Sequence, residues 1–568
     1  MNDTSTRQRS NARLIRWRIA GMLVLVWLYL FVGVFDHELW PPTEQAFAGV
    51  TWEMFRSGDL LVPRINGLPY LEKPPLAYAL SWVGFELAGR PGSGLLRLPE
   101  ALLGLAGLGL LFWIARYHFG ERAAWGVTLL CATTANYFGI MHRASTDAVA
   151  VAFCFACFAL FMRTMAPAAG TPAGWSSRGL TPPPGSARYD LWFCLLLALS
   201  FFVKNFYTFL VIVPPVTIYL AGTRQFARLV RIGAVSTVIL IAMLAPWAWL
   251  LHAQGGNELL RVVFIDNTFG RFLNLQDAAA LMQNPLNDAS VVHKRPFWFG
   301  PQALISHSLP WILVDGAALY ALYSQRARNE ASLFLKIAFA ALMIFVTLSS
   351  SKVSAYYLPV IFLLSMITGN FLRGLDVGLL TSANYRRLVA ANIGLVLAVL
   401  LAAPVVGAIL LDFPALYALL PLNIAGAGAV LYWLRRRGPN TRDPRAWGGF
   451  AAASIALSLG IAIPHIDQER SWQPFYDLIR DESAPRELWT TVDDRKLPAT
   501  NFYLDRRVEL ARNSEQLLTL LRGSKPVSAI VWTWEYDQIR DQLKGVPHSV
   551  VRAPSGHDRL IYLDNTPK

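Results

Sequence analysis

Charged residues are scarce in this sequence of 568 residues. Asp, Glu, Lys and Arg together make up 15% of the chain, whereas hydrophobic residues make up 54% and the mean hydropathy is +0.38. A soluble globular protein carries about 25% charged residues. Apolar stretches near twenty residues recur along the chain, which is the length that a helix needs to cross about 30 Å of hydrocarbon. The shortage of charge therefore excludes a string of soluble domains and predicts a polytopic α-helical membrane protein.

Cysteine is also scarce, and its four positions lie in apolar stretches: Cys131, Cys154, Cys157 and Cys194. Two of them form a C-x-x-C pattern, but the sequence has no second pair or histidine cluster to complete a zinc site. We therefore interpret all four as buried small hydrophobic residues. A small-residue cleavage site is likewise missing after the first apolar run, residues 19–35, so we predict an uncleaved first span rather than a signal peptide.

Thirteen apolar segments are predicted to span the membrane. They are residues 19–35, 98–116, 123–141, 147–165, 189–203, 205–222, 232–251, 302–323, 332–349, 354–372, 387–410, 415–434 and 446–464. Every second loop between them is rich in arginine, and basic loops stay in the cytoplasm. The net charge of +14 is thus explained by topology and does not indicate nucleic acid. The alternation predicts a cytoplasmic N-terminus.

The alternate segments are then predicted to face the outside: loops 36–97 and 252–301, several short turns, and the tail 465–568. This tail is rich in charge and contains β-prone runs at 487–492, 528–534 and 559–563, with helical patterns at 514–521 and 536–543 between them. Strands that alternate with helices predict a small α/β domain. We expect a transmembrane domain over residues 1–464 and a periplasmic domain over 465–568.

The first outer loop is too long and too patterned for a simple connector. After two prolines, residues 43–56 place apolar side chains on one helical face, which predicts an amphipathic helix along the membrane surface. Residues 60–76 are predicted to be extended, and a second apolar segment covers 77–89. Glu72 and Lys73 come at the junction of these two segments, beside the bilayer.

These loop patterns resemble the first periplasmic loop of the aminoarabinose transferase and protein mannosyltransferase group of membrane glycosyltransferases. The matching pieces are Leu39 to Glu44, Trp52 to Asp59, Pro63, and Asn66 to Leu76. Further pieces follow in the same order as in that group: His142 to Asp147, Val203 to Asn205, Asn267 to Phe272, His293 to Phe299, Leu309 to Trp311, and Ser350 to Pro359. The match covers most of residues 20–375 and is specific for the family but not for the substrate.

The resemblance implies a GT-C fold of about thirteen spans with a soluble C-terminal domain. It also implies an enzyme that moves a sugar from a polyprenyl phosphate to an acceptor on the outer face, with a lipid A-type phosphate as the leading expectation. One departure matters, because the family helix opens with Pro-Asp-Glu-x-Arg. Here Thr43 stands where the family has its catalytic aspartate, and Ala46 stands where it has the arginine.

The proposed chemistry needs cations more than it needs acids. A sugar leaves a polyprenyl phosphate without a general acid, but the developing phosphate charge must be neutralised. The resemblance assigns Lys73 and Arg271 to this task, with Lys204 and Lys352 as further carrier-binding candidates, because lysines on outer loops oppose the positive-inside trend. A snorkelling side chain is the alternative reading of each lysine.

On the acceptor side, a hydroxyl nucleophile needs a base, whereas a phosphate is already ionised. With Thr43 in place of the aspartate, the remaining carboxylate candidates are Asp147, Glu72 and Glu44, the last pointing about 100° away from Thr43 on a helix. The resemblance places further cavity residues at Tyr70, His293 and Tyr357. No cofactor is required, although a divalent cation near Glu72 and His293 is a second prediction.

Three other functions remain open from the sequence. The chain could transfer a sugar to a protein hydroxyl, it could move a lipid-linked sugar across the membrane, or it could bind the carrier without transfer. Transporters usually show two related halves with ionisable residues at mid-membrane, and we find no such repeat. The only feature that supports carrier binding without transfer is Thr43, which replaces the aspartate of the family.

Overall fold

The computed structural model describes residue 27 and residues 30–40, 43–167, 182–270, 295–327, 329–348, 352, 354–380, 383–437, 444–491, 499–544, 548–552 and 560–565. The predicted first span, residues 19–35, therefore lies largely outside the described residues.

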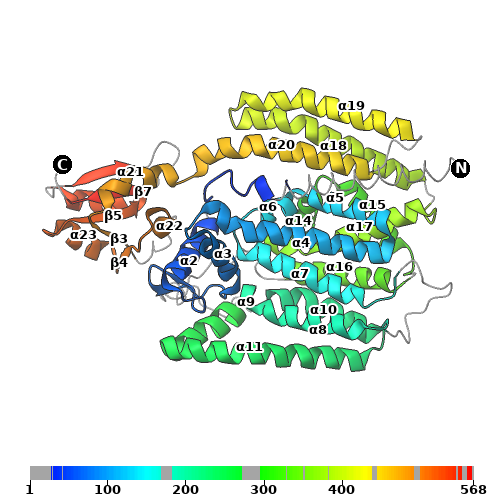
Figure 1. Ribbon diagram of the computed structural model, residues 1–568, viewed down its shortest axis with the longest axis horizontal. Helices are drawn as coiled ribbons and strands as arrows, with labels where there is room; N and C mark the ends of the chain where they lie inside the picture. Colours follow the sequence, from blue (N-terminus) through cyan, green and yellow to red (C-terminus); the bar gives the residue numbers. More distant parts are fainter. Residues whose placement is uncertain are drawn as a thin grey trace.

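Long apolar helices form the body of the molecule and run side by side (Figure 1). Within the described ranges, nine helices are long and apolar enough to cross a membrane, and three shorter apolar helices accompany them. In chain order the helices of this part are α2 (Thr43–Ser57), α3 (Leu76–Ala88), α4 (Ser93–Phe119), α5 (Glu121–Ala132), α6 (Ala135–Met141), α7 (Thr146–Arg163), α8 (Ser186–Leu199), α9 (Phe201–Lys204), α10 (Tyr207–Gly222), α11 (Phe226–Leu260), η2 (Arg261–Gly270), α14 (Phe299–Ser308), α15 (Ile312–Ser324), α16 (Glu330–Leu348), η3 (Ser354–Tyr357), α17 (Val360–Asp376), α18 (Ala383–Leu410), η4 (Pro414–Ala418), α19 (Leu419–Arg437) and α20 (Pro444–Arg470).

Several predicted spans are interrupted rather than continuous, and two of them divide into separate α-helices with at least two non-helical residues between them. The segment 123–141 divides into α5 and α6, because the hydroxyls of Thr133 and Thr134 donate to carbonyls at the end of α5, at 2.8 Å to Leu129 and 3.0 Å to Leu130. The segment 302–323 divides into α14 and α15 around Pro310, which has no N–H to continue a helix. The prediction of single helices was wrong at both places.

The centre of the bundle is packed by aromatic side chains of α7, α16 and α17. Phe158 stacks on Phe362 with ring centres 5.7 Å apart, and Phe161 packs on Phe334 at 5.1 Å. All four cysteines are buried and free, as small hydrophobic residues would be. Most of α7 and α17 is buried inside the bundle, whereas α11 leaves most of its apolar surface exposed at the edge. Helix α7 is therefore a central element on which a site can be fixed.

The C-terminal part is a small α/β unit at one end of the bundle (Figure 1). Its sheet has the order β4-β3-β5-β7-β6, in which β3, β4 and β5 are parallel and β7 is antiparallel to both neighbours. The elements are α21 (Gln473–Ser483), β3 (Glu487–Thr491), α22 (Thr500–Leu504), β4 (Glu509–Ala511), α23 (Ser514–Arg522), β5 (Val527–Trp532), α24 (Thr533–Ile539), η6 (Arg540–Leu543), β6 (Ser549–Arg552) and β7 (Leu560–Asp564). The predicted strands and helices are confirmed. The expected boundary at residue 464 falls inside α20, which continues to Arg470.

The predicted helix over residues 43–56 is confirmed as α2, and it is enclosed between α3 and the C-terminal unit. Residues 44, 45 and 47–54 are all buried. The reason is a set of contacts from around α22: Asn501 donates to the Gly49 carbonyl at 3.1 Å, and Asp505 accepts from the Trp52 indole at 2.8 Å. The polar face of α2, which the sequence suggests is exposed to solvent, is therefore covered by residues far along the chain, 452 and 453 positions from their partners.

The extended segment after α2 forms a short hairpin of β1 (Arg64–Ile65) and β2 (Leu68–Pro69). Asn66 and Gly67 turn the chain with φ of 49° and 81°, which is the usual role of an Asn-Gly pair. The Asn66 side chain also accepts the backbone N–H of Val508, at 3.3 Å. The C-terminal unit thus contacts both the helix and the hairpin of the first outer loop.

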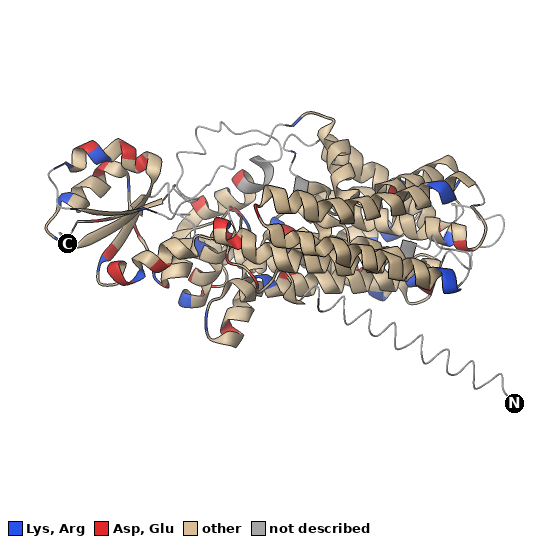
Figure 2. Cartoon of the chain, turned by 90° about the horizontal axis from the view of Figure 1, so that it is seen from above, with Lys and Arg blue, Asp and Glu red and all other residues tan. Residues whose placement is uncertain are grey.

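Several of the arginine and lysine residues lie at the end of the bundle that is farthest from the sheet (Figure 2). The sheet and the first outer loop share the opposite end (Figure 1). This arrangement agrees with a membrane protein whose basic loops share one side.

Candidate functional site

Four segments from distant parts of the sequence meet at the end of the bundle nearest the sheet. The short helix α9 contacts α3, α7 and α10, and the Tyr207 ring on α10 packs against Tyr356 of η3 at 5.5 Å. These segments carry parts of four motifs singled out in the sequence: Leu76 begins α3, Asp147 lies in α7, Lys204 ends α9 and Tyr356 lies in η3. The folded chain therefore brings together motifs that were separate in the sequence.

Asp147 and Lys204 form an ion pair at this meeting point. Their side chains are 26% and 10% exposed, so the pair is largely enclosed but still open to a small part of the surface. Ser145 caps α7 by accepting the N–H of Ala148 at 3.3 Å, which places Asp147 in the first turn. A carboxylate near a helix N-terminus is favoured by the helix dipole.

Two tyrosines surround the ammonium group of Lys204. Its Nζ lies 4.7 Å from the ring centre of Tyr207 and 4.9 Å from that of Tyr356. Such rings stabilise a cation through their quadrupole. Sequence reasoning missed both tyrosines, and it named the neighbouring Tyr357 instead. Tyr357 is fully buried and packs on Phe299 of α14, with ring centres 6.0 Å apart.

The turn after Lys204 contains a difference from the family motif. The family has a Lys-Gly turn here, and this chain has Asn205. Asn205 adopts φ of 50° and ψ of −138°, which lies outside the left-handed helical well in which asparagine is common. The turn therefore holds an asparagine in a backbone conformation that favours glycine, and Lys204 stands directly before it.

A second ion pair joins two consecutive residues of the first outer loop. Lys73 Nζ lies 3.0 Å from Glu72 Oε1, and the Tyr70 hydroxyl donates to Glu72 Oε2. The side chains of Lys73 and Glu72 are 20% and 18% exposed. Glu72 also lies near enough to act electrostatically on Lys204. The two lysines and the two carboxylates therefore belong to one charged cluster.

Thr43 and Glu44 open α2 but differ in their surroundings. Thr43 is exposed, whereas Glu44 is buried and bound by Arg97 of α4, at 2.7 Å and 2.8 Å for its two oxygens. Burial alone would raise the pKa of Glu44, but the Arg97 guanidinium outweighs burial and holds this pKa below its usual value. Arg97 was not predicted, since it stands in an apolar helix with no motif around it.

The remaining predicted residues are only partly described. Lys352 is half-buried, while Arg271 and His293 lie outside the described residues. In the described part of the chain, no group of three His, Cys, Asp or Glu side chains could hold a metal ion. A divalent cation at Glu72 and His293 is thus without support from the described residues.

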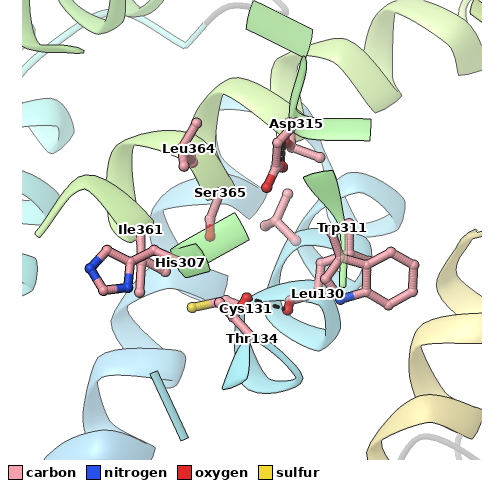
Figure 3. A pocket seen from close by; sticks show the side chains of 11 residues that line it. Leu130, Cys131, Thr134, His307, Trp311, Asp315, Ile361, Leu364 and Ser365 are labelled. Atoms are coloured by element: carbon pink, nitrogen blue, oxygen red, sulfur yellow. Dashed lines mark hydrogen bonds between the residues drawn. The ribbon is translucent and has the colours of Figure 1, made fainter. Parts of the chain in front are cut away.

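A small cavity lies elsewhere in the bundle, between α5, α14, α15 and α17 (Figure 3). It has about 10 Å³ of free space, close to what one water molecule needs. Asp315 points into this region and accepts a hydrogen bond from Thr368 at 2.7 Å. None of the predicted site residues lines the cavity, so we do not assign it to the charged cluster.

Comparison with known structures identifies the architecture. The crystal structure of ArnT from Cupriavidus metallidurans bound to undecaprenyl phosphate superposes with a TM-score of 0.75, covering 97% of this chain and 98% of that chain at 20% identity. This chain has the GT-C fold. The similarity to the GT-C structure extends through the C-terminal unit, and it confirms the fold class predicted from the sequence.

Sequence comparison agrees with this GT-C assignment. Undecaprenyl phosphate-alpha-4-amino-4-deoxy-L-arabinose arabinosyl transferase 1 of Pseudomonas fluorescens is 25% identical over 361 residues, which is 62% of this chain and 57% of the relative. The corresponding transferase of Pectobacterium atrosepticum is 24% identical over 463 residues, 79% of this chain and 77% of that protein. The matched region is thus less than two thirds of the length of the first of these relatives. No protein-family model matches the chain.

Proposed function

We propose that this protein transfers a sugar from a polyprenyl-phosphate donor to a lipid phosphate acceptor of the lipid A type. The supporting observation is the charged cluster, in which Lys73 and Lys204 each carry a carboxylate partner at the outer end of the bundle. The names of the relatives and the undecaprenyl phosphate bound to the similar structure support the same donor class. Transfer takes place at the outer face of the cytoplasmic membrane.

In this proposal the lysines receive the carrier phosphate. Lys73 and Lys204, with Arg271 and Lys352, neutralise the charge that develops as the sugar leaves. Asp147 and Glu72 hold the two lysine ammonium groups in place before the donor binds and orient the acceptor afterwards. Because lysines supply the positive charge, the scheme needs no divalent cation. Full transfer after treatment with a metal chelator is the expected result, and loss of transfer restored by a cation would support the alternative near Glu72 and His293.

The acceptor follows from Thr43. A threonine hydroxyl cannot act as a base at neutral pH, whereas a phosphate acceptor is already anionic and needs none. The test is transfer by purified protein, with one donor, to a phosphate-bearing lipid and to a hydroxyl-bearing acceptor. We expect transfer to the phosphate and a large loss in Asp147→Asn. Transfer to the hydroxyl acceptor alone would overturn this assignment and favour protein glycosylation.

Carrier binding without transfer to either acceptor would instead favour a binding or transport protein. To exclude an inactive preparation, the same sample should retain undecaprenyl phosphate, and Asp147→Asn should serve as the matched negative control. Persistent absence of transfer in a carrier-bound sample contradicts the proposed activity.

We also propose the orientation predicted from the arginine-rich loops, with a cytoplasmic N-terminus and residues 465–568 in the periplasm. A reporter fused after Lys568 tests this directly. A periplasm-dependent reporter should be active there, and activity of a reporter that works only in the cytoplasm would contradict the orientation.

A further inference from the structure

The carboxylate of Glu44 has no remaining position for a proton or a ligand. Its Oε1 accepts from Arg97 Nε at 2.7 Å and from the backbone N–H of Ala144 at 3.1 Å. Its Oε2 accepts from Arg97 Nη2 at 2.8 Å and from the backbone N–H of Trp40 at 2.9 Å. A carboxylate offers about four acceptor positions, and all four are used here.

Arg97 is equally occupied. Its Nη1 donates to the carbonyls of Val34 and His37, at 3.3 Å and 2.8 Å, and its Nη2 also donates to the carbonyl of Glu38. With the two bonds to Glu44, all five guanidinium N–H groups have partners. The guanidinium thereby fixes Glu44 to the beginning of the first outer loop, and both side chains are almost completely buried.

The bond from Glu44 to Ala144 links α2 to the segment that carries Asp147. Ala144 precedes Ser145, the residue that caps α7, and Asp147 follows in the first turn of that helix. The position of the Ala144 backbone therefore determines where α7 begins and where the Asp147 carboxylate lies. Lys204 in turn takes its position from Asp147.

We propose that Glu44 is a positioning residue, which acts on the reaction only through Asp147 by holding the backbone at Ala144. This inference rests on the proposed transfer reaction, and it assigns Glu44 a different role from that of a substitute base. Glu44 thus supports the Asp147 carboxylate, although Thr43 beside it carries no acid.

The first measurement needs no activity. Hydrogen exchange of the full-length protein in lipid nanodiscs is compared between wild type, Glu44→Gln and Glu53→Gln, in a peptide that contains residues 142–148. Glu53 is the matched control, since it lies on the same helix, is equally buried and pairs with Arg507 instead of Ala144. We expect at least tenfold faster exchange in Glu44→Gln and less than twofold change in Glu53→Gln.

The second measurement is a double-mutant cycle on the rate of transfer. If Glu44 acts through Asp147, Glu44→Gln reduces the rate at least tenfold in the wild-type background. It then reduces the rate less than twofold in the Asp147→Asn background. The acidic limb of the pH profile should stay where it is in wild type, because the pKa of Glu44 lies below its usual value and this group is already ionised.

Glu44→Asp guards against a folding defect, because it keeps the charge opposite Arg97 while shortening the side chain. Glu44→Asp should also increase hydrogen exchange at residues 142–148 and lower the rate of transfer, but by less than Glu44→Gln does. Independent, multiplying losses with Asp147→Asn, a shifted acidic limb, or unchanged exchange at residues 142–148 would each overturn the proposal. If the wild type transfers sugar to neither acceptor, the proposed function fails, and the exchange comparison still decides whether Glu44 holds this backbone.

Discussion

Three ion pairs around the first outer loop differ in how far their side chains are exposed. The Arg97 and Glu44 side chains are 0% and 3% exposed, whereas Lys204 and Asp147 are 10% and 26% exposed and Lys73 and Glu72 are 20% and 18% exposed. Arginine is the cation of the buried pair, where its planar guanidinium group donates hydrogen bonds to five acceptor atoms. Lysine occupies the other two of these three pairs, where a compact ammonium on a flexible chain can exchange one anionic partner for another. We therefore expect the buried arginine to serve stability, and the two more exposed lysines to serve the proposed binding of phosphate.

Removing the buried cation should have the largest effect. Arg97→Ala leaves the buried Glu44 charge without its partner, and such a loss costs about 3–5 kcal/mol of stability. Thermal unfolding in detergent or nanodiscs should reveal it. A fall of less than about 1 kcal/mol would show that Arg97 is not the structural member of the comparison.

Removing a more exposed cation should weaken donor binding without comparable loss of stability. Lys73→Ala should reduce affinity for undecaprenyl phosphate by about 1.5–3 kcal/mol, the range for hydrogen bonds to charged groups. We predict the same range for Arg271→Ala. Carrier titration measures both, and unchanged affinity in the two variants would reject the assignment of these cations to the phosphate.

Restoring the missing acid should do less. Thr43→Asp places a carboxylate at an exposed position beside Glu44, so the fold should tolerate it. Because a phosphate acceptor needs no base, we expect less than about a tenfold gain in transfer to it, or about 1.4 kcal/mol. A larger gain on the native acceptor would show that the chain lacks a base that it needs.

The smallest effect is expected at the surface. Arg56 and Asp505 form an ion pair between α2 and the C-terminal unit, but both side chains are nearly half exposed. Exposed pairs contribute about 0.2–1 kcal/mol. Arg56→Gln should therefore change the unfolding temperature little, and a loss comparable with that of Arg97→Ala would remove the distinction between buried and more exposed pairs.

Much of this architecture could be predicted because it depends on local properties. The length of the apolar segments predicted most of the helices, and short β-prone runs predicted strands β3, β5 and β7. Asp147 and Lys204 were each singled out by a motif, but their pairing joins positions 57 residues apart and has no local signal. The same is true of Arg97, whose partners come from the loop before α2 and from Glu44. Tyr356 and Tyr357 are adjacent, and only the direction of η3 decides which one faces the lysine.

Helix α20 has a mechanical consequence. It ends at Arg470, and two residues separate it from α21 of the C-terminal unit. Asp467, near its end, accepts hydrogen bonds from the Glu38 backbone at 3.0 Å and from the Trp40 indole at 2.8 Å. The C-terminal unit is therefore coupled to the first outer loop, and a movement of this unit away from the bundle would also move residues 38–40. In the proposed reaction, we expect the lipid acceptor to reach the site along the plane of the bilayer and not through movement of the C-terminal unit.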